Sequence, residues 1–346
     1  MPIKLNICFF SNESLEQLQK EQYSIQDINI LTDLGHQVTI ATSFREVPFG
    51  CDLYFSWWAS GSIFPLIKAR LSGRPIIVVA GGNEAVFYRD SVTSAPLGYL
   101  AAPWYKKLAT RLCLRLANRV LVVSKFMTKD VKTLGAKNPI LVPNSVDTTL
   151  FKKASGSRHF VTSIFNLDED VVRIKRGENF IRSIPHVIQT FPEAKFIIIG
   201  RKGNAFNRLA ALAKDLGIDQ HLDFIGNIEN TLVAHWMQSS LAYVQISDTE
   251  TFGVAIAEAM SCGVPVVVSY RGAIPDLVGD DGIYVDQNNP ASVAEGICTA
   301  LSAGMETEGG LETRSRDRIE RYYSYESRKQ KIADIISDLF PYAPRH

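Results

Sequence analysis

Twelve short apolar runs, separated by longer segments with helical spacing, constrain the fold of this 346-residue chain more than any other feature. Six runs come before residue 145: Lys4–Phe10, Gln37–Thr42, Asp52–Trp57, Pro75–Ala80, Arg119–Ser124 and Pro139–Asn144. Six more follow it: Phe160–Asn166, Ala194–Gly200, Leu222–Gly226, Leu241–Ile246, Pro265–Tyr270 and Gly282–Asp286. Continuous hydrophobicity indicates strands buried on both faces, and the segments between them are long enough for crossover helices. The pattern predicts an α/β protein with two doubly wound parallel sheets.

The boundary between the two predicted domains is expected in the stretch 143–157, where polar residues replace periodic apolar ones. We therefore expect one domain at residues 1–150 and a second at 151–321, with a charged C-terminal helix, at about 322–346, that packs back on the first. Ligands of open parallel sheets bind beyond the carboxyl ends of the strands. The loops that follow the strands are therefore the expected place for chemistry.

Composition excludes several classes of protein. A hydrophobic content of 46% is too high for a disordered chain, and a net charge of +1 is not that of a typical nucleic-acid-binding protein. Five scattered cysteines without CxxC spacing predict a reduced, cytoplasmic protein. The charge is nevertheless unevenly distributed along the chain. Residues 1–150 hold 16 basic and 11 acidic side chains, and residues 151–346 hold 21 basic and 25 acidic ones.

The segment 246–265 carries the strongest functional signal. A strand is expected to end near Ile246, and a helix to run from about Gly253 to Gly263, so that Glu250 lies in the loop and Glu258 on the helix. Backbone amides at Thr251, Phe252 and Gly253 would attract a phosphate group. Carboxylates beside such a site suit hydroxyl groups, and a ligand with an anionic middle and hydroxyl-rich ends is a nucleotide sugar. The alternative is a surface helix with an N-terminal acid and an exposed Glu258.

This segment resembles a known motif. Glu250 and Glu258, separated by seven residues, together with Phe252-Gly253 and Gly263-Val264-Pro265-Val266, resemble the EX7E motif of family 4 retaining glycosyltransferases, which have the GT-B fold. Further segments resemble that family's other landmarks: Leu34-Gly35-His36-Gln37-Val38, Val122-Val123-Ser124, Val142-Pro143-Asn144-Ser145-Val146-Asp147 and Phe224-Ile225-Gly226. The matches cover most of residues 31–290. The resemblance implies a GT-B protein with two Rossmann-like domains that face each other across a cleft.

The resemblance also implies roles for individual residues. Glu258 would bind the donor's ribose hydroxyls, and Glu250 would contact the transferred sugar. Amides at Thr251, Phe252 and Gly253 would hold the diphosphate and the sugar, and the loop at Gly226 and Asn227 would receive the nucleotide base.

A basic pair after the first strand of the second domain usually neutralises the diphosphate in this family. Here Asn166 stands where an arginine is usual, and the basic residues lie further on. We expect Arg173 and Arg176 to take this role, with Lys175 as the alternative. A solvated basic turn is the competing interpretation.

On the acceptor side the resemblance is weaker, because the glycine-rich turn after the first strand and the histidine after the fourth are missing. Gly81, Gly82, Asn83 and Glu84 follow the fourth predicted strand and are candidates for acceptor or phosphate contacts, although a plain turn is equally compatible.

The implied reaction moves a hexose-type sugar from a nucleotide-sugar donor to a glycan or lipid-linked acceptor, in the synthesis of a cell-surface polysaccharide or glycolipid. The leaving phosphate is expected to accept the acceptor's proton, and no metal or other cofactor is expected. Asp168-Glu169-Asp170 looks like an acidic metal motif, but we interpret it as an acidic loop. Two alternatives are a non-catalytic sugar-nucleotide-binding protein and a GT-B-fold sugar-nucleotide epimerase.

One further segment is strongly basic. Lys107, Arg111, Arg115 and Arg119 recur every four residues, next to Lys106 and beside a row formed by Leu108, Leu112 and Leu116. Such a helix suits docking on an anionic membrane surface, at the inner face of the membrane. The alternative is a helix that packs into the core and has a solvated basic edge.

Overall fold

The computed structural model describes residues 4–18, 22–153, 156–303 and 311–341. The chain divides into two compact units, Met1–Ser145 with Tyr325–His346 and Val146–Ser324. We expected the division near residue 150 and the return to the first unit near residue 322. Residues 154 and 155 of the expected linker, and 342–346 of the expected C-terminal helix, lie outside the described residues.

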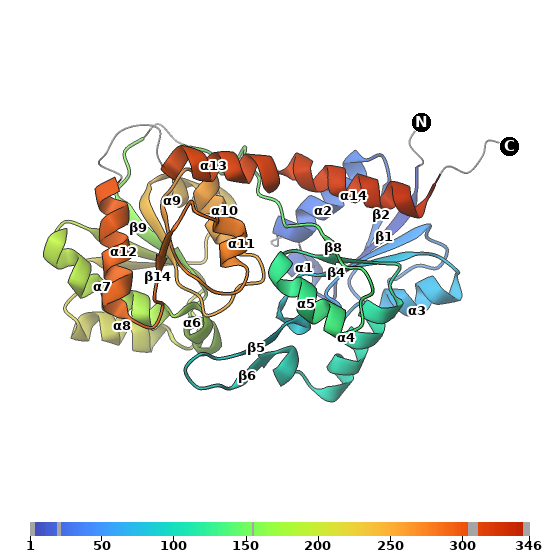
Figure 1. Ribbon diagram of the computed structural model, residues 1–346, viewed down its shortest axis with the longest axis horizontal. Coiled ribbons are helices and arrows are strands. Elements are labelled where there is room, and N and C mark those ends of the chain that lie inside the picture. The colour runs from blue at the N-terminus through green and yellow to red at the C-terminus, as the bar shows by residue number, and fades with distance from the viewer. Residues whose placement is uncertain (1–3, 19–21, 154–155, 304–310, 342–346) are drawn as a thin grey trace. The chain divides into compact units, whose positions relative to one another are not determined.

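The first unit is built on a parallel sheet of six strands (Figure 1). Its strands are β1 (Asn6–Phe10), β2 (Gln37–Ala41), β3 (Leu53–Trp57), β4 (Ile76–Ala80), β7 (Arg119–Val122) and β8 (Ile140–Leu141). Their order is β2-β1-β3-β4-β7-β8, so the chain reverses its direction of travel across the sheet between β1 and β3. A short antiparallel pair, β5 (Phe87–Arg89) and β6 (Pro96–Gly98), was not predicted.

The second unit contains another parallel sheet of six strands. Its strands are β9 (Phe160–Ile164), β10 (Lys195–Ile199), β11 (Leu222–Gly226), β12 (Ser240–Gln245), β13 (Val266–Ser269) and β14 (Ile283–Val285). In the order β11-β10-β9-β12-β13-β14, the chain reverses its direction of travel across the sheet between β9 and β12. We call this position the switch point of the second sheet. The predicted α/β class with two doubly wound parallel sheets is confirmed.

Helices lie on both sides of each sheet in Figure 1. Those of the first unit are α1 (Leu15–Leu18), α2 (Gln22–Asp33), α3 (Ile63–Leu71), α4 (Trp104–Leu116), α5 (Lys125–Thr133) and α14 (Tyr325–Leu339), with 3₁₀ turns η1 (Asn83–Ala85) and η2 (Tyr99–Ala101). Those of the second unit are α6 (Glu169–Lys175), α7 (Gly177–Thr190), α8 (Phe206–Asp215), α9 (Asn230–Gln238), α10 (Val254–Ser261), α11 (Ile274–Val278), α12 (Pro290–Ala303) and α13 (Leu311–Tyr322). Among the described residues, no helix is both long enough and apolar enough to cross a membrane.

The core of the second unit explains why its strands read as continuous apolar runs. Phe196 and Ile198 of β10 and Val244 of β12 are fully buried, and they belong to one cluster with Phe180 of α7 and Ile297 of α12. Helices cover both faces, so alternate residues of each strand are buried too. Each fully buried side chain of this size contributes about 1.5–3 kcal/mol to folding.

The first unit is closed by a buried ion pair. The guanidinium of Arg328, on α14, donates from Nε and Nη2 to the two carboxylate oxygens of Asp27, on α2, at 2.6 and 2.7 Å. The same carboxylate accepts a hydrogen bond from Trp57 Nε1 at 2.9 Å. Arg328 Nη1 also donates to the carbonyls of Val142 and Pro143. Removing one partner of such a pair costs about 3–5 kcal/mol because the other charge stays buried.

The basic helix differs from its prediction in two ways. It ends at Leu116, because Ala117 has extended backbone angles, and Arg119 is the first residue of β7 rather than part of the helical row. The side that packs into the core carries Thr110, Cys113 and Leu114, whereas Leu108, Leu112 and Leu116 are exposed. The helix therefore packs into the core, but through a side other than the leucine row.

Candidate active site

The predicted donor residues gather at the switch point of the second sheet. β9 and β12 are neighbours there, and their carboxyl ends lead into Asn166 and into the loop that begins at Ile246. Asn166 Oδ1 accepts a hydrogen bond from the backbone N–H of Arg201 at 2.9 Å, which ties this loop to the one after β10. Open parallel sheets bind their ligands at this kind of position.

Glu250 is held in one orientation by three donors on the same oxygen. Its Oε1 accepts hydrogen bonds from Lys175 Nζ at 2.5 Å, Gln245 Nε2 at 2.6 Å and Ser247 Oγ at 2.7 Å. Only 13% of its side chain is exposed. Charge-assisted hydrogen bonds of this kind are roughly twice as strong as neutral ones, so the carboxylate is fixed before any ligand binds.

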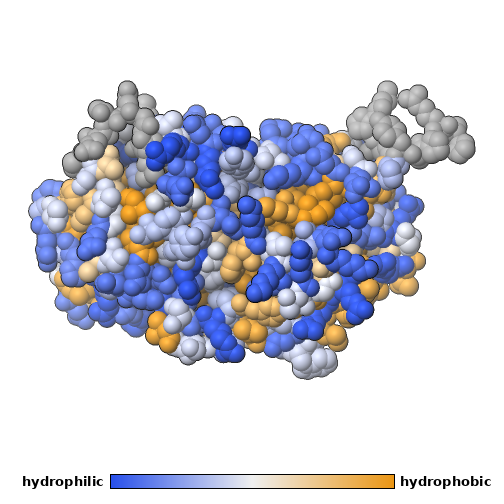
Figure 2. All heavy atoms as spheres, viewed as in Figure 1, coloured by the Kyte–Doolittle hydropathy of each residue, from blue (hydrophilic) through white to orange (hydrophobic). Residues whose placement is uncertain are grey.

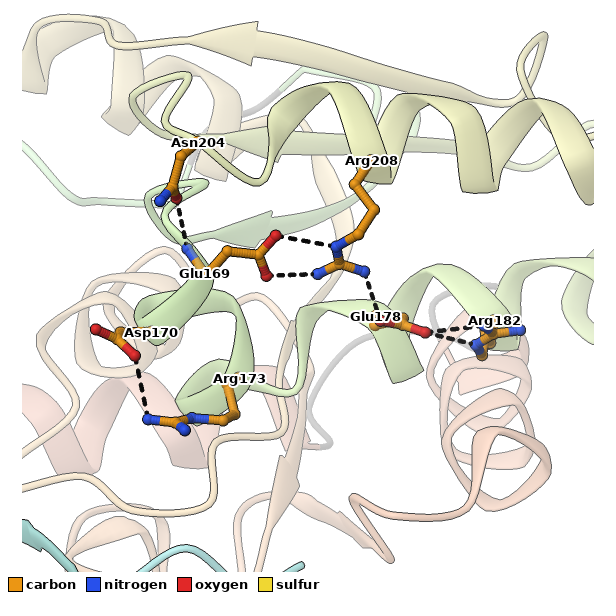
Figure 3. A network of polar contacts seen from close by, with 7 residues as sticks. All are labelled: Glu169, Asp170, Arg173, Glu178, Arg182, Asn204 and Arg208. Atoms are coloured by element: carbon orange, nitrogen blue, oxygen red, sulfur yellow. Dashed lines mark hydrogen bonds and ion pairs between the residues drawn. The ribbon is translucent and has the colours of Figure 1, made fainter. Parts of the chain in front are cut away.

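The three basic residues expected at the diphosphate each pair with an acid. Lys175 contacts Glu250, and Arg176 Nη2 lies 3.2 Å from Asp248 Oδ2. Arg173 instead contacts Asp170 at 3.1 Å, one turn earlier on its own helix (Figure 3). The structure thus brings Lys175 and Arg176 to the glutamate loop.

The Arg176 backbone lies in the left-handed region at φ +52°, where it joins α6 to α7. This turn directs the chain so that consecutive residues 175 and 176 reach two different acids of the same loop.

The acidic residues Asp168, Glu169 and Asp170 stand at the start of α6, and each forms an ion pair with an arginine. Asp168 pairs with Arg201, and Glu169 pairs with Arg208 through two hydrogen bonds at 3.0 and 2.8 Å. Figure 3 shows that Arg208 also reaches Glu178, at 2.7 Å. The interpretation as an acidic loop is therefore wrong for Glu169 and Asp170, which lie in the first turn of α6.

Two residues of this region were missed by sequence reasoning. Asp248 is almost fully buried, and besides Arg176 it has Arg271 Nη2 at 3.7 Å from Oδ1. Arg271 Nε also donates to the Asp248 carbonyl at 3.3 Å. Two guanidinium groups around one carboxylate leave a net positive charge beside Glu250. The sequence feature that could have identified Arg271 is its position in the loop directly after a predicted strand, where ligand-binding residues are expected.

Gly272, the next residue, explains how closely these two loops approach. It lies at φ +57°, and a Cβ atom there would be 2.5 Å from the Glu250 carbonyl oxygen and 2.6 Å from its amide nitrogen. The N–H of Ala273 donates to the same carbonyl at 2.9 Å. Only glycine fits this contact without moving Glu250.

Glu258 lies on α10, which begins at Val254 after Gly253 at φ +97°. Its side chain is buried. Burial raises the pKa of Glu258 to about 8. The sequence alternative of an exposed Glu258 is therefore wrong.

Tyr243 shows that the two glutamates lie in one environment. Burial raises the pKa of its hydroxyl well above the ordinary value, and the charges of Glu250 and Glu258 raise it further. The Tyr243 hydroxyl donates to Gln245 Oε1 at 2.5 Å, and Gln245 in turn holds Glu250.

The remaining donor candidates lie around this centre. The side chain of Phe252 is buried against Tyr323, with ring centroids 5.7 Å apart, so a contact from Phe252 to a ligand would come from its backbone. Thr251 precedes it in the same loop. Gly226, at φ +90°, ends β11, and Asn227 follows it as an exposed residue.

The acceptor candidates belong to the first unit, after β4. A Cβ atom on Gly81 would lie 2.4 Å from the Trp57 ring, and one on Gly82 would lie 2.5 Å from the Trp58 ring. Asn83 and Glu84 form part of η1. Glu84 Oε1 accepts a hydrogen bond from the N–H of Ala59 at 3.2 Å, and burial raises the pKa of this carboxyl to about 7.

The chain is similar to several known proteins. The family described as glycosyl transferases group 1 matches residues 170–318. A phosphatidylinositol N-acetylglucosaminyltransferase subunit from Arabidopsis thaliana is 27% identical over 200 residues, which cover 57% of this chain and 43% of that protein. The D-inositol 3-phosphate glycosyltransferase of Acidothermus cellulolyticus is 25% identical and covers 85% of this chain and 68% of its own length. The chain spans about half the length, or less, of several curated relatives.

Solved structures share the fold over almost the whole chain. A glycosyltransferase from Rickettsia africae superposes with a TM-score of 0.78 at 14% identity, covering 98% of this chain and 100% of that one. Anabaena HepE in complex with UDP and glucose superposes with a TM-score of 0.75 at 16% identity, covering 96% and 99%. Residues 170–318 therefore carry the domain described as glycosyl transferases group 1, and the chain as a whole has the GT-B fold.

Proposed function

We propose that this chain is a retaining hexosyltransferase, which moves a hexose-type sugar from a nucleotide-sugar donor to a glycan or lipid-linked acceptor in polysaccharide or glycolipid synthesis. The observation that carries the proposal is the arrangement of Glu250, Lys175 and Glu258 at the switch point of the second sheet. Relatives named for phosphatidylinositol support the lipid-linked acceptor class.

Glu258 suits the ribose of the donor. A buried carboxylate is costly to keep charged, and hydrogen bonds from two vicinal hydroxyls would offset that cost. Its place on an EX7E-like motif supports the same role. The fold is shared with HepE, which was solved with UDP and with UDP-glucose.

Glu250 and the basic residues suit the reacting end of the donor. In the proposed reaction the bond between the anomeric carbon and the phosphate oxygen breaks, and the acceptor oxygen bonds to the same face of that carbon. The acceptor's proton passes to the leaving phosphate. Negative charge grows on that phosphate, so Lys175, Arg176 and Arg271 would stabilise the transition state more than the ground state.

In this proposal, cationic side chains rather than a metal ion or other cofactor neutralise the diphosphate. Each of them shares a carboxylate when no donor is present, because Lys175 contacts Glu250 and Arg176 and Arg271 flank Asp248. Incoming phosphate would compete for these cations. The reaction is proposed to occur in the cytoplasm, at the inner face of the membrane when the acceptor is lipid-linked.

A panel of UDP-, GDP-, ADP- and dTDP-sugars in thermal unfolding tests the donor class, since a ligand that binds only the folded protein stabilises it by about 2.7 kcal/mol at a hundredfold excess over Kd. We expect one nucleotide series to raise Tm and the others to leave it unchanged. A null result with all four would contradict the proposal.

The stabilising donor is then incubated with candidate acceptors and with water alone. Transfer or slow hydrolysis supports a transferase. Binding without turnover would indicate the non-catalytic alternative, and conversion of the donor to an isomeric nucleotide sugar would indicate an epimerase.

A further inference from the structure

Helix α4 presents an apolar row to solvent instead of to the core. Trp104, Leu108, Leu112 and Leu116 follow one another at intervals of four residues, and their side chains are 76%, 50%, 37% and 39% exposed. Tyr105 beside them is 56% exposed. At about 100° of rotation per residue, this row lies roughly opposite the buried side of the helix, so packing within the first unit does not account for it.

A basic row runs along one side of the apolar row. It consists of Lys107, Arg111 and Arg115, and α4 contains no acidic residue. Lys107 Nζ donates to the Leu100 carbonyl and Arg111 Nε donates to the Tyr99 hydroxyl, both at 2.9 Å. These contacts hold two of the positive charges close to the helix surface, next to the apolar row.

Helix α3 adds a second exposed apolar row. Phe64, Ile67 and Leu71 are 39%, 44% and 73% exposed, and their spacing places them on one side of the helix. α3 and α4 contact each other, and Arg70 donates to the Leu116 carbonyl where both helices end. Figure 2, drawn in the same view as Figure 1, shows hydrophobic residues interspersed with hydrophilic ones on the surface around α4.

The C-terminal end of α4 borders a basic cavity of about 480 Å³. Arg70, Arg115, Arg119 and Lys137 line it, together with apolar side chains such as Ile140. Arg119 shares its charge with Asp338, which leaves the cavity with more positive than negative groups among its described lining residues. A phosphate group is the complementary ligand for such a cavity.

We propose that this face, formed by the exposed rows of α3 and α4 and the basic row of α4, docks on a membrane surface rich in anionic phospholipid. The aromatic and aliphatic side chains would enter the interfacial layer, while the basic residues meet lipid phosphates. Charge complementarity selects this occupant, because an apolar row flanked by cations on an acid-free helix matches an anionic lipid surface. The inference deepens the proposed function by naming the surface on which a lipid-linked acceptor is met.

The test is co-sedimentation of the full chain with vesicles of phosphatidylcholine, alone or mixed with an equal amount of phosphatidylserine. We expect binding only to the mixed vesicles, and weaker binding as salt is added. The double variant L108Q/L112Q should lose at least tenfold in affinity. The double variant R111Q/R115Q should lose about 25-fold, at roughly fivefold for each basic residue near an anionic surface.

Matched variants separate docking from general effects. K129Q/K132Q removes two exposed basic residues from α5, and L232Q removes an exposed leucine from α9. Both should bind vesicles like the wild type. Equal losses in K129Q/K132Q and R111Q/R115Q would overturn the proposal, as would wild-type chain that ignores anionic vesicles.

Trp104 provides a readout that does not depend on a destabilising change. Its emission should shift to the blue when mixed vesicles are added, and the shift should disappear in W104F while W104F still sediments. A blue shift of the emission that persists in W104F would overturn the proposal. So would light scattering that shows L108Q/L112Q to be a monomer where the wild type is a dimer, if lipid binding is unchanged. Binding of UDP, measured separately by thermal unfolding, reports on the proposed function. The membrane-docking proposal and the proposed function can therefore fail independently.

Discussion

Replacing Glu258 by glutamine should make the protein more stable and a poorer nucleotide binder at the same time. Burial raises the pKa of this carboxyl from its ordinary value of 4.5 to about 8. The folded protein therefore holds the Glu258 proton more tightly than the unfolded chain does. Stability is greatest below about pH 4.5 and falls as the pH rises toward 8, where the loss is complete.

The size of the stability change follows from the same two pKa values. At pH 7 the ionisable carboxyl lowers the free energy of unfolding by about 3 kcal/mol, and at pH 5 by about 1 kcal/mol, relative to a neutral side chain. Glutamine has nearly the same shape and does not ionise. The E258Q variant should therefore gain stability that is several times larger at pH 7 than at pH 5.

Nucleotide binding should change in the opposite direction. Losing the charged acceptor of two ribose hydroxyls should cost about 1–3 kcal/mol, which corresponds to a five- to 150-fold weaker Kd. Both effects can be measured by chemical denaturation and by UDP titration at the two pH values. The matched control is E295Q, which changes an exposed glutamate on α12 and should alter neither quantity.

Two outcomes would refute this reasoning. If the stability gain is the same at pH 5 and pH 7, Glu258 is not a buried carboxyl with a raised pKa. If UDP binds E258Q as tightly as the wild type, Glu258 does not contact the ribose.

Three further predictions concern the loop around Glu250. In E250Q, the turnover number should fall by more than tenfold while the UDP affinity changes less than threefold. The reason is that three donors position that carboxylate for the sugar rather than for the nucleotide. Equal losses of turnover in steady-state kinetics and of UDP affinity in titration would contradict this. Gly272→Ala should destabilise the protein and abolish turnover because the added Cβ atom would clash with the Glu250 backbone. Gly217→Ala is the control, since Gly217 also has a positive φ but a Cβ atom there would meet no atom within 4 Å. It should cost only the backbone strain of about 1 kcal/mol in urea unfolding. Asp248→Ala should cost about 3–5 kcal/mol in the same assay because it removes a buried ion pair with Arg176. A loss below about 1 kcal/mol would show that this pair is solvated.

The two sheets could be predicted because their strands are covered on both faces. Runs such as Ile76–Ala80 and the three valines that begin β13 are continuously apolar, and that property is visible locally. The pair Phe87–Arg89 and Pro96–Gly98 could not be found in this way, because each strand has three residues and neither is fully buried. Short strands of this kind depend on pairing with each other rather than on composition.

The site was partly predictable for the same reason. The spacing of Glu250 and Glu258 is a local property, whereas the contact of Glu250 with Lys175 joins residues 75 positions apart. The burial of Asp248 depends on two arginines from different loops, and charged side chains are rarely buried without such partners.

The periodicity of α4 likewise identified two rows but not which side faces the core. Thr110, Cys113 and Leu114 fill that side, although the leucine row is the more hydrophobic one. Which side is buried depends on the shape of the sheet beneath the helix.

The contact between Arg328 and Asp27 has a consequence for the order in which the chain can fold. These residues are 301 positions apart, and all of Val146–Ser324 is synthesised between them. Until Arg328 leaves the ribosome, Asp27 and the Trp57 side chain lack the cation that completes their buried contact. The second unit, by contrast, is continuous in sequence and can fold as soon as it is made. The unit whose translation begins first is thus the last to complete its folding. A chain stopped after residue 324 should contain a folded second unit attached to an incomplete first unit.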